Sequence, residues 1–242
     1  RPYSGVVKNG DTVYVAGQAS IDQNAKTVGA GDIRAQIRQT WLNIEEGMKA
    51  VGGSLKDIVK VSTFATDVMA VAPWLDVWQE LYGPGEAPAS TFVEVPRLAR
   101  PGLMVEIEAI GYLGKDVERI KPTTMAQNVP YSQVVRAGET VYVSGQLAYD
   151  RNTDLIGHGD IQAQLAQVWN NIELAMEAVG GSIDKVVNVT DYVTEIVTLS
   201  NFYEAWNKVF SQETRPGSSF IEVPRLDYAG AMVSVEAIGF LG

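Results

Sequence analysis

Two glutamates are the first candidates for acid–base chemistry in this chain. Glu108 and Glu236 stand mid-way along segments of alternating side chains, on the face that also carries methionine, isoleucine and an aromatic residue. A carboxyl group buried on such a face has a raised pKa and can act as a general acid or base. The alternative role is a hydrogen bond or salt bridge between domains. We treat both as candidate catalytic residues and leave that structural role open.

Tyrosine and serine side chains offer ligand binding rather than proton transfer. Tyr3 and Tyr131 could stack on a ligand or hydrogen-bond to it, or could pack at the start of a strand. A serine nucleophile needs a neighbouring base. The single histidine, His158, lies in a loop before an expected helix, so a Ser–His arrangement can occur at most once. We interpret His158 as an exposed loop residue.

Composition argues against metal and phosphate-cofactor sites. The chain has no cysteine, and one histidine cannot build a usual zinc site. Gly52-Gly53 follows an expected helix rather than preceding one, so the helix dipole is oriented against phosphate binding. We therefore expect no metal and no cofactor.

The charge balance bears on partners and location. The 242 residues include 19 Lys and Arg against 29 Asp and Glu, a net charge of -10. Such a chain repels phosphate backbones and anionic membranes. No apolar run reaches the length of about 18 residues that a membrane span needs, and nothing resembles a signal peptide. We expect a cytoplasmic protein that binds neither nucleic acid nor membranes.

The chain is an internal repeat. The segment PYSGVVKNGDTVYVAGQ at Pro2 returns as PYSQVVRAGETVYVSGQ at Pro130, an offset of 128, and FVEVPRL returns as FIEVPRL at the same offset. A repeat this long is a domain rather than a solenoid unit. We predict one domain at residues 1–114 and a second at 129–242. The unmatched residues 115–128 are charged and contain proline, as a linker would.

Each copy has the pattern of an α+β domain. Apolar residues at steps of three and four predict a helix capped by Asp32, and Pro73 suits the first position of a second, shorter helix. Residues rich in Thr, Val and Tyr after a Gly-Asp turn predict a hairpin. In the first copy, strands are predicted at residues 6–7, 12–18, 58–64, 91–95 and 103–113, and helices at 33–51 and 73–81.

The last strand of each copy has two apolar faces. Side chains alternate along a strand, so Met104, Ile110 and Tyr112 share a face with both glutamates of that strand, opposite the face that packs on the helices. A solvent-exposed face would rarely carry such residues. We expect the sheet of another copy to cover it, within or between chains, and hence a homo-oligomer.

Both copies resemble, over their whole length, the Rid/YjgF (reactive intermediate deaminase-like) family. The resemblance rests on the order and spacing of short segments, which recur 128 residues later. In the first copy they are Pro2-Tyr3-Ser4, Val15-Ala16-Gly17-Gln18, Gln39, Asn43-Ile44, Val51-Gly52-Gly53, Val93-Glu94-Val95 and Val105-Glu106-Ile107-Glu108. It implies a chorismate-mutase-like fold, with an antiparallel or mixed sheet and two helices on one face. It also implies pockets between neighbouring domains and a trimer, here of two-domain chains.

The resemblance also points to the site. Active members of the family hold a substrate carboxylate with an arginine in a P-A-R-S-type strand, where the guanidinium fork matches two oxygens. Ser90 and Ser218 stand at that position here, so both copies depart from the pattern. Tyr3, Gly17 and Glu108 are kept, with their counterparts in the second copy. The implied substrate-binding residues are Tyr3, Tyr131, Ser90, Ser218, Ser144, Phe92, Phe220 and Tyr203.

The departure at the arginine position argues against the usual deamination of amino-acid-derived imines. We predict an enzyme for hydrolysis or deamination of a small, uncharged or cationic nitrogen-containing metabolite, with Glu108 or Glu236 as the acid–base group. The alternative is a non-catalytic ligand-binding or regulatory protein. A ribonuclease activity, ascribed to some relatives, is disfavoured by the acidic charge. Because the copies differ around the expected clefts, as at Ala16 and Ser144, we expect only one class of cleft to bind ligand.

Overall fold

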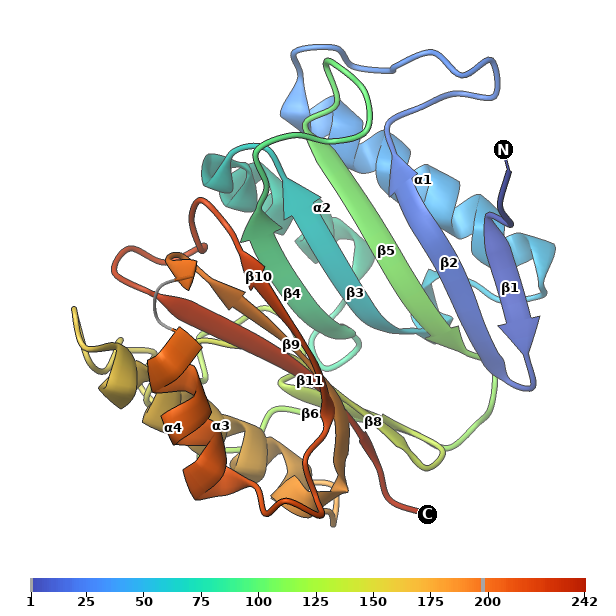
Figure 1. The fold of residues 1–242 in the computed structure, drawn as a ribbon. Helices are drawn as coiled ribbons and strands as arrows, with labels where there is room; N and C mark the ends of the chain where they lie inside the picture. The colour runs from blue at the N-terminus through green and yellow to red at the C-terminus, as the bar shows by residue number, and fades with distance from the viewer. Residues whose placement is uncertain (1, 197–198) are drawn as a thin grey trace.

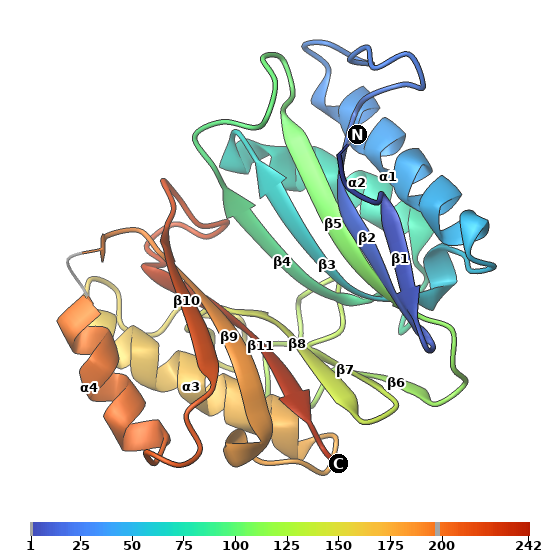
Figure 2. The same cartoon turned by 45° about the vertical axis from the view of Figure 1, so that its right-hand side comes forward.

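The computed structural model describes residues 2–196 and 199–242. The two repeats fold as two α+β halves, each a β-sheet with helices on one face (Figure 1). The helices lie on the outside and the two sheets lie between them, as a second view confirms (Figure 2). This is the α+β arrangement expected from the sequence, in tandem.

The first domain is a five-stranded sheet in the order β1-β2-β5-β3-β4. β3 and β4 are parallel and the other neighbours are antiparallel, so the sheet is mixed. The parallel pair needs a crossover connection, and α2 provides it. The elements are β1 (Val6–Asn9), β2 (Thr12–Ala19), α1 (Ile33–Ala50), β3 (Ile58–Ala65), α2 (Val71–Leu81), β4 (Ala89–Glu94) and β5 (Val105–Tyr112).

The second domain repeats this plan with one strand more. Its sheet has the order β10-β9-β11-β8-β7-β6, and β6 comes from the segment expected to be a linker. β6 pairs antiparallel with β7, so this segment is built into the second sheet. The elements are β6 (Val117–Ile120), β7 (Val134–Ala137), β8 (Thr140–Gln146), α3 (Ile161–Glu177), β9 (Val186–Val193), α4 (Leu199–Val209), β10 (Gly217–Glu222) and β11 (Val233–Phe240).

The long helix forms as its sequence predicts. The side chain of Asp32 accepts a hydrogen bond from the backbone N–H of Ala35 at 3.0 Å, which satisfies one of the free donors at the helix start. After the helix, Gly52 takes a positive φ of 85°, which favours glycine. The side chains that α1 buries against the sheet are the predicted stripe, Ile37, Trp41, Ile44 and Met48.

Several element boundaries in the first domain differ from the sequence prediction by one or two residues. α2 begins at Val71, so Pro73 is its third residue rather than its first. Proline is accepted there because the first N–H groups of a helix have no acceptor within the helix. β4 begins at Ala89, two residues earlier than predicted, because Ala89 already pairs with Lys60 of β3; it also forms a β-bridge with Ser132 of the second domain.

The two domains share an apolar cluster at the ends of their sheets. Val59 and Ala89 of the first domain are buried against Val135 and Tyr142 of the second. Ile110, which stands on the sheet face that we expected to be covered, packs against this cluster. The expected covering of that face by another copy of the sheet therefore occurs within the chain.

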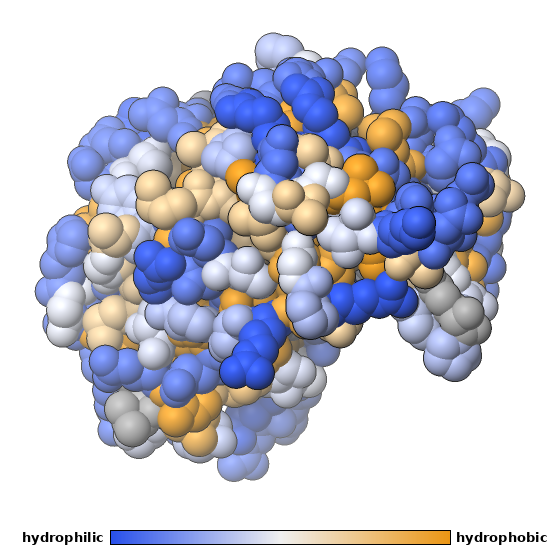
Figure 3. Space-filling view, turned by 90° about the horizontal axis from the view of Figure 1, so that it is seen from above, coloured by the Kyte–Doolittle hydropathy of each residue, from blue (hydrophilic) through white to orange (hydrophobic). Residues whose placement is uncertain are grey.

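The covering is partial. Val7, Tyr14, Ile221 and Phe240 keep 42–49% of their surface exposed. Viewed from above, the surface is largely hydrophilic with apolar patches between the charged groups (Figure 3). None of the described helices has the length and apolar character to cross a membrane.

Candidate functional site

A cavity of about 280 Å³ lies between the two domains. The first domain supplies one wall from α2 and β4. The second supplies the segment before β7, strands β8 and β11, and the loops that follow β8 and precede β11. The lining residues are Val71, Trp74, Leu75, Ser90, Phe92, Asn128, Val129, Pro130, Tyr131, Gly145, Leu147, Tyr149, Thr153, Asp227, Tyr228 and Ser234. Cavities of this kind are where small ligands bind.

Three of the residues predicted from the sequence meet in this cavity. Ser90 and Phe92 reach it from β4 of the first domain, and Tyr131 reaches it from the second. Tyr131 is half-buried there, and desolvation raises the pKa of its phenol. The phenol therefore stays protonated and can donate a hydrogen bond.

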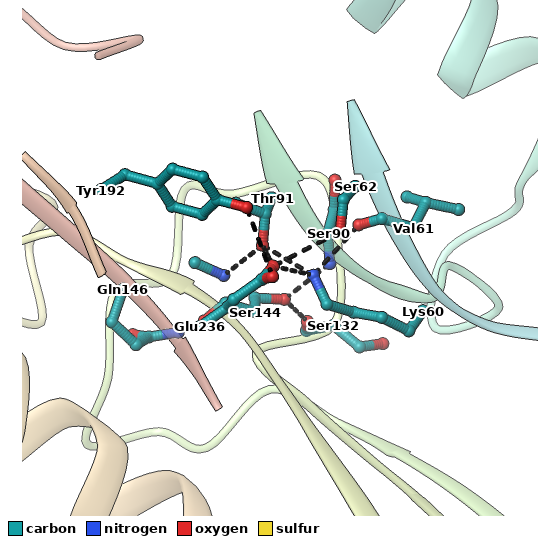
Figure 4. A network of polar contacts seen from close by, with 11 residues as sticks. Lys60, Val61, Ser62, Ser90, Thr91, Ser132, Ser144, Gln146, Tyr192 and Glu236 are labelled. Carbon is teal, nitrogen blue, oxygen red and sulfur yellow. Dashed lines mark hydrogen bonds and ion pairs between the residues drawn. The ribbon is translucent and has the colours of Figure 1, made fainter. Parts of the chain in front are cut away.

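Ser144 lies behind the cavity wall and joins the domains. Its hydroxyl donates to the carbonyl of Ser132 at 2.6 Å and accepts from the backbone N–H of Ser90 at 2.8 Å. Both bonds are buried, and they hold β4 of the first domain beside β8 of the second (Figure 4). Ser144 thus positions Ser90 and does not line the cavity.

Glu236 takes part in a buried ion pair outside this cavity. Its Oε2 lies 2.6 Å from Nζ of Lys60 and 2.5 Å from Oγ1 of Thr91, so the network crosses the domain boundary (Figure 4). Burial alone would raise the pKa of Glu236, but the charge and hydrogen bonds of Lys60 and Thr91 outweigh it and lower the pKa. The carboxylate is therefore held ionised, and its contacts with Lys60 and Thr91 link the second domain to the first.

Glu108 faces a different hollow. It lines a cavity of about 330 Å³ on the inner face of the first sheet, together with Tyr14, Lys60 and Ser62. Burial raises its pKa, and the nearby charge of Glu236 adds to the effect. Glu108 therefore does not share a cavity with either of the predicted tyrosines.

A separate hollow lies on the first domain, at the positions that correspond to the second-domain wall of the interdomain cavity. Tyr3 and Gly17 line a wider hollow of about 650 Å³ with Glu106 and Arg100. Burial raises the pKa of Glu106, whose carboxyl oxygen lies against Gly17. In the second copy Ser234 stands at this position and lines the interdomain cavity. The sequence reasoning favoured Glu108 and missed Glu106, and the register of β5 beside β2 decides which glutamate meets Gly17.

The remaining predicted residues lie at the outer edge of the second domain. The hydroxyl of Ser218 donates to Oδ2 of Asp191 at 2.8 Å, and the ring of Phe220 packs 4.8 Å from that of Phe202. Tyr203 is 59% exposed. These residues correspond to the first-domain wall of the interdomain cavity, but none of them lines that cavity. Asp191, also missed, is buried and its pKa is raised to about 7 by desolvation.

Asp227 is the carboxyl group that the sequence reasoning missed in the cavity itself. Burial raises its pKa to about 6, and its charge in turn raises the pKa of Tyr131 and of Tyr149. The counterpart of Asp227 in the first copy is Ala99, so nothing in the shared repeat pattern marks it. Its one signal in the sequence is this difference between the copies.

Aromatic rings form two walls of the cavity. Tyr149 and Tyr228 meet edge to face, with ring centroids 5.1 Å apart and planes at 89°. On the other side Trp74 and Phe92 meet at 5.8 Å and 70°. These pairs fix the ring positions. In the described part of the chain no cluster of His, Cys, Asp and Glu side chains could hold a metal ion.

A family model described as endoribonuclease L-PSP matches residues 1–113 and 122–240. The chain belongs to this family, also called Rid/YjgF, in two tandem copies. A RutC family protein of Pyrococcus horikoshii is 39% identical over 111 residues, which is 46% of this chain and 86% of that protein. Protein mmf2, mitochondrial, of Schizosaccharomyces pombe is 34% identical over 45% of this chain and 86% of its own length.

Solved structures of L-PSP proteins match one domain at a time. A putative endoribonuclease of Thermotoga maritima covers 51% of this chain and 96% of its own, at 29% identity and a TM-score of 0.48. RidA of a Psychrobacter species covers 51% and 98%, at 30% identity and 0.47. TdcF of E. coli, solved with bound serine, covers 52% and 99%, at 22% identity and 0.48.

Proposed function

We propose that this L-PSP protein is an enzyme that uses water to break a carbon–nitrogen bond, by hydrolysis or deamination, in a small metabolite bound in the interdomain cavity. The observation that carries the proposal is Asp227, a carboxyl group that lines the cavity with its pKa raised to about 6 by burial. A group that titrates near neutral pH can both accept and return a proton during a reaction.

For an imine substrate, the proposed reaction is the addition of water to the C=N bond followed by loss of ammonia. The oxygen of water bonds to the carbon of the C=N group, while the Asp227 carboxylate takes the proton that the water gives up. The same proton then passes to the nitrogen and gives a carbinolamine. The carboxylate next takes the hydroxyl proton of this intermediate and passes it to the nitrogen as the carbon–nitrogen bond breaks, and the products are a carbonyl compound and ammonia. Ser90 and Ser234, which line the cavity on either side, have hydroxyl groups that can orient the water.

A carboxylate-bearing imine is a poor fit to this cavity. No Lys, Arg or His is among the described residues that line it, so a substrate carboxylate has no cationic partner there. The same lack argues against a phosphate-rich substrate such as RNA. The sequence-based expectation of an uncharged or cationic substrate is consistent with both points.

The test compares two imines that differ by one carboxylate. Oxidation of 2-aminobutyrate by an amino-acid oxidase generates 2-iminobutyrate, and oxidation of propylamine by an amine oxidase generates the matching imine without the carboxylate. We expect the protein to accelerate breakdown of the second imine and not of the first. The rate of imine breakdown by Asp227→Asn should be about 10²–10⁴-fold lower than that of the wild type, because the variant lacks the general acid–base group.

The sequence-based candidates are tested in the same assay. If Glu108→Gln or Glu236→Gln abolishes turnover while Asp227→Asn leaves it intact, the acid–base group is one of the glutamates and our assignment is wrong. Because Glu236 also links the domains, its variant must be compared at equal folded fraction, measured by tryptophan fluorescence.

A non-catalytic ligand-binding function is the second candidate. It is favoured by Ser234, which stands where the first copy carries Glu106 and leaves the interdomain cavity with one carboxyl group fewer. Binding of amines or imines without acceleration of either imine would support this function against an enzyme.

We extend the proposal to assembly as a homo-oligomer, a trimer of two-domain chains. Its support is the partly uncovered inner sheet surface around Tyr14 and Phe240, which are 48% and 43% exposed. Light scattering coupled to gel filtration measures the mass directly, and a monomer at micromolar concentration would exclude the trimer.

A further inference from the structure

The interdomain cavity is electrically one-sided. Of the described residues that line it, Asp227 is the one Asp, Glu, Lys, Arg or His, and burial raises the pKa of the Tyr131 and Tyr149 phenols beside it. None of the described residues that line the cavity is a cation that could neutralise this carboxylate. A buried carboxylate without a positive partner favours a ligand that brings one.

The aromatic walls add to this preference. Tyr131, Tyr149 and Tyr228 belong to the second domain, and Trp74 and Phe92 face them from the first. Ring faces attract cations, and the attraction is stronger where the site is shielded from water, as it partly is around the half-buried Tyr131 and Tyr149. A carboxylate among aromatic rings is the arrangement that binds organic ammonium and guanidinium groups.

The repeat provides an internal comparison. At the positions of Asp227, Tyr228 and Tyr149 the first copy has Ala99, Arg100 and Ile21, which line the separate hollow around Tyr3. The second copy therefore carries the carboxyl group and two of the rings that the first copy lacks at these positions. Three matched differences at one cavity are more than the packing of the fold requires, because the first copy folds without them.

We propose that the interdomain cavity selects a small organic cation, an ammonium, guanidinium or protonated imine that carries no carboxylate. This inference rests on the proposed function for the location of the site, and it names the substrate class. Asp227 is the anionic anchor, and the rings of Trp74, Phe92, Tyr131, Tyr149 and Tyr228 surround the cation.

A binding experiment tests the charge preference without any turnover. Choline and 3,3-dimethylbutan-1-ol have the same shape and differ by the charge, so their dissociation constants from calorimetric titration isolate the contribution of the cation. Butyrate supplies an anion of similar size. We expect choline to bind at least about tenfold more tightly than the neutral isostere, and butyrate not to bind measurably.

Variants locate the effect. Asp227→Asn keeps the shape of the side chain and removes the charge, so it should bring choline to the affinity of the isostere. Asp184→Asn removes an equal charge from an exposed position outside the cavity and should change neither affinity. Ser90→Arg places a cation in the cavity wall and should reverse the order, so that butyrate binds and choline does not.

The outcomes separate this inference from the proposed function. If the chain accelerates imine breakdown but binds choline no better than the isostere, the enzyme proposal stands and the cation preference is wrong. If choline binds through Asp227 and no imine is turned over, the cation site stands and the enzyme proposal fails. A preference that survives in Asp227→Asn would also overturn the inference, since the cation would then be bound elsewhere.

Discussion

Replacing Lys60 by methionine removes the cation from the ion pair that joins the two domains. Lys60 is 5% exposed, and its Nζ lies 2.6 Å from Oε2 of Glu236. Thr91 and Ser62 still hydrogen-bond to this carboxylate in the variant, but they carry no charge to balance it. Breaking a buried pair from one side costs about 3–5 kcal/mol. Because the side chain of Glu236 is 15% exposed, we expect a loss of about 3 kcal/mol in the free energy of unfolding.

The pH dependence of this loss follows from the carboxylate. In the native protein the pKa of Glu236 is lowered from 4.5, so the group contributes stability above that pH and loses it as the pH falls through the lower native value. Without Lys60, burial dominates and the pKa of Glu236 lies above 4.5. The variant then loses stability as the pH rises from 4.5 through the raised value. The difference between the two proteins should therefore grow from acid to neutral pH.

Urea unfolding followed by tryptophan fluorescence measures this difference at about pH 5 and pH 7. Trp78 is a suitable reporter, because its Nε1 donates to the carbonyl of Pro130 across the domain boundary at 3.1 Å. Lys49→Met is the control: this exposed lysine pairs with Glu45 and Glu46, and its loss should change little at either pH. The double variant Lys60→Met with Glu236→Gln should regain stability. A Lys60→Met protein within about 1 kcal/mol of the wild type at pH 7 would refute the reasoning.

Three further predictions concern the cavity and the surface. Turnover in the interdomain cavity should rise with pH through about 6, where Asp227 ionises, and a pH–rate profile without this inflection would remove Asp227 from the reaction. Ser144→Ala should cost about 1–3 kcal/mol by leaving the buried N–H of Ser90 without an acceptor, as measured by thermal unfolding; an unchanged melting temperature would show that water replaces the hydroxyl. Aspartate at both Tyr14 and Phe240 should reduce the oligomer mass in light scattering, whereas an unchanged mass would place the interface elsewhere.

Prediction from the sequence succeeded where the pattern is local and repeated. The apolar stripe from Ile37 to Met48, the capping Asp32 and the alternating last strand are short-range signals, and each occurs twice. Strand and helix positions followed from them with shifts of a few residues. Among those shifts are the start of α2, which lies before Pro73, and the start of β4 at Ala89, which pairs with Lys60 of β3.

The residues of the site were predicted less well than the helices and strands, because a site is formed by residues that are distant in the sequence and close in space. Strand alternation placed Glu106 and Glu108 on one face, but the pairing of β5 with β2 puts Glu106 against Gly17 and leaves Glu108 over a separate hollow. Asp227 lies in an irregular loop, where no periodicity reports on burial. Its raised pKa comes from the other elements that surround it.

The sequence by itself determined that this protein is a tandem pair of α+β domains of the Rid/YjgF kind. Those properties are carried by the order and period of residues along the chain. Only the tertiary structure decided that Ser90 of one copy and Tyr131 of the other line a single cavity, that Glu236 pairs with Lys60, and that Asp227 brings a carboxylate into that cavity. Burial and charge pairing arise from contacts between distant segments, and one-dimensional spacing does not encode them.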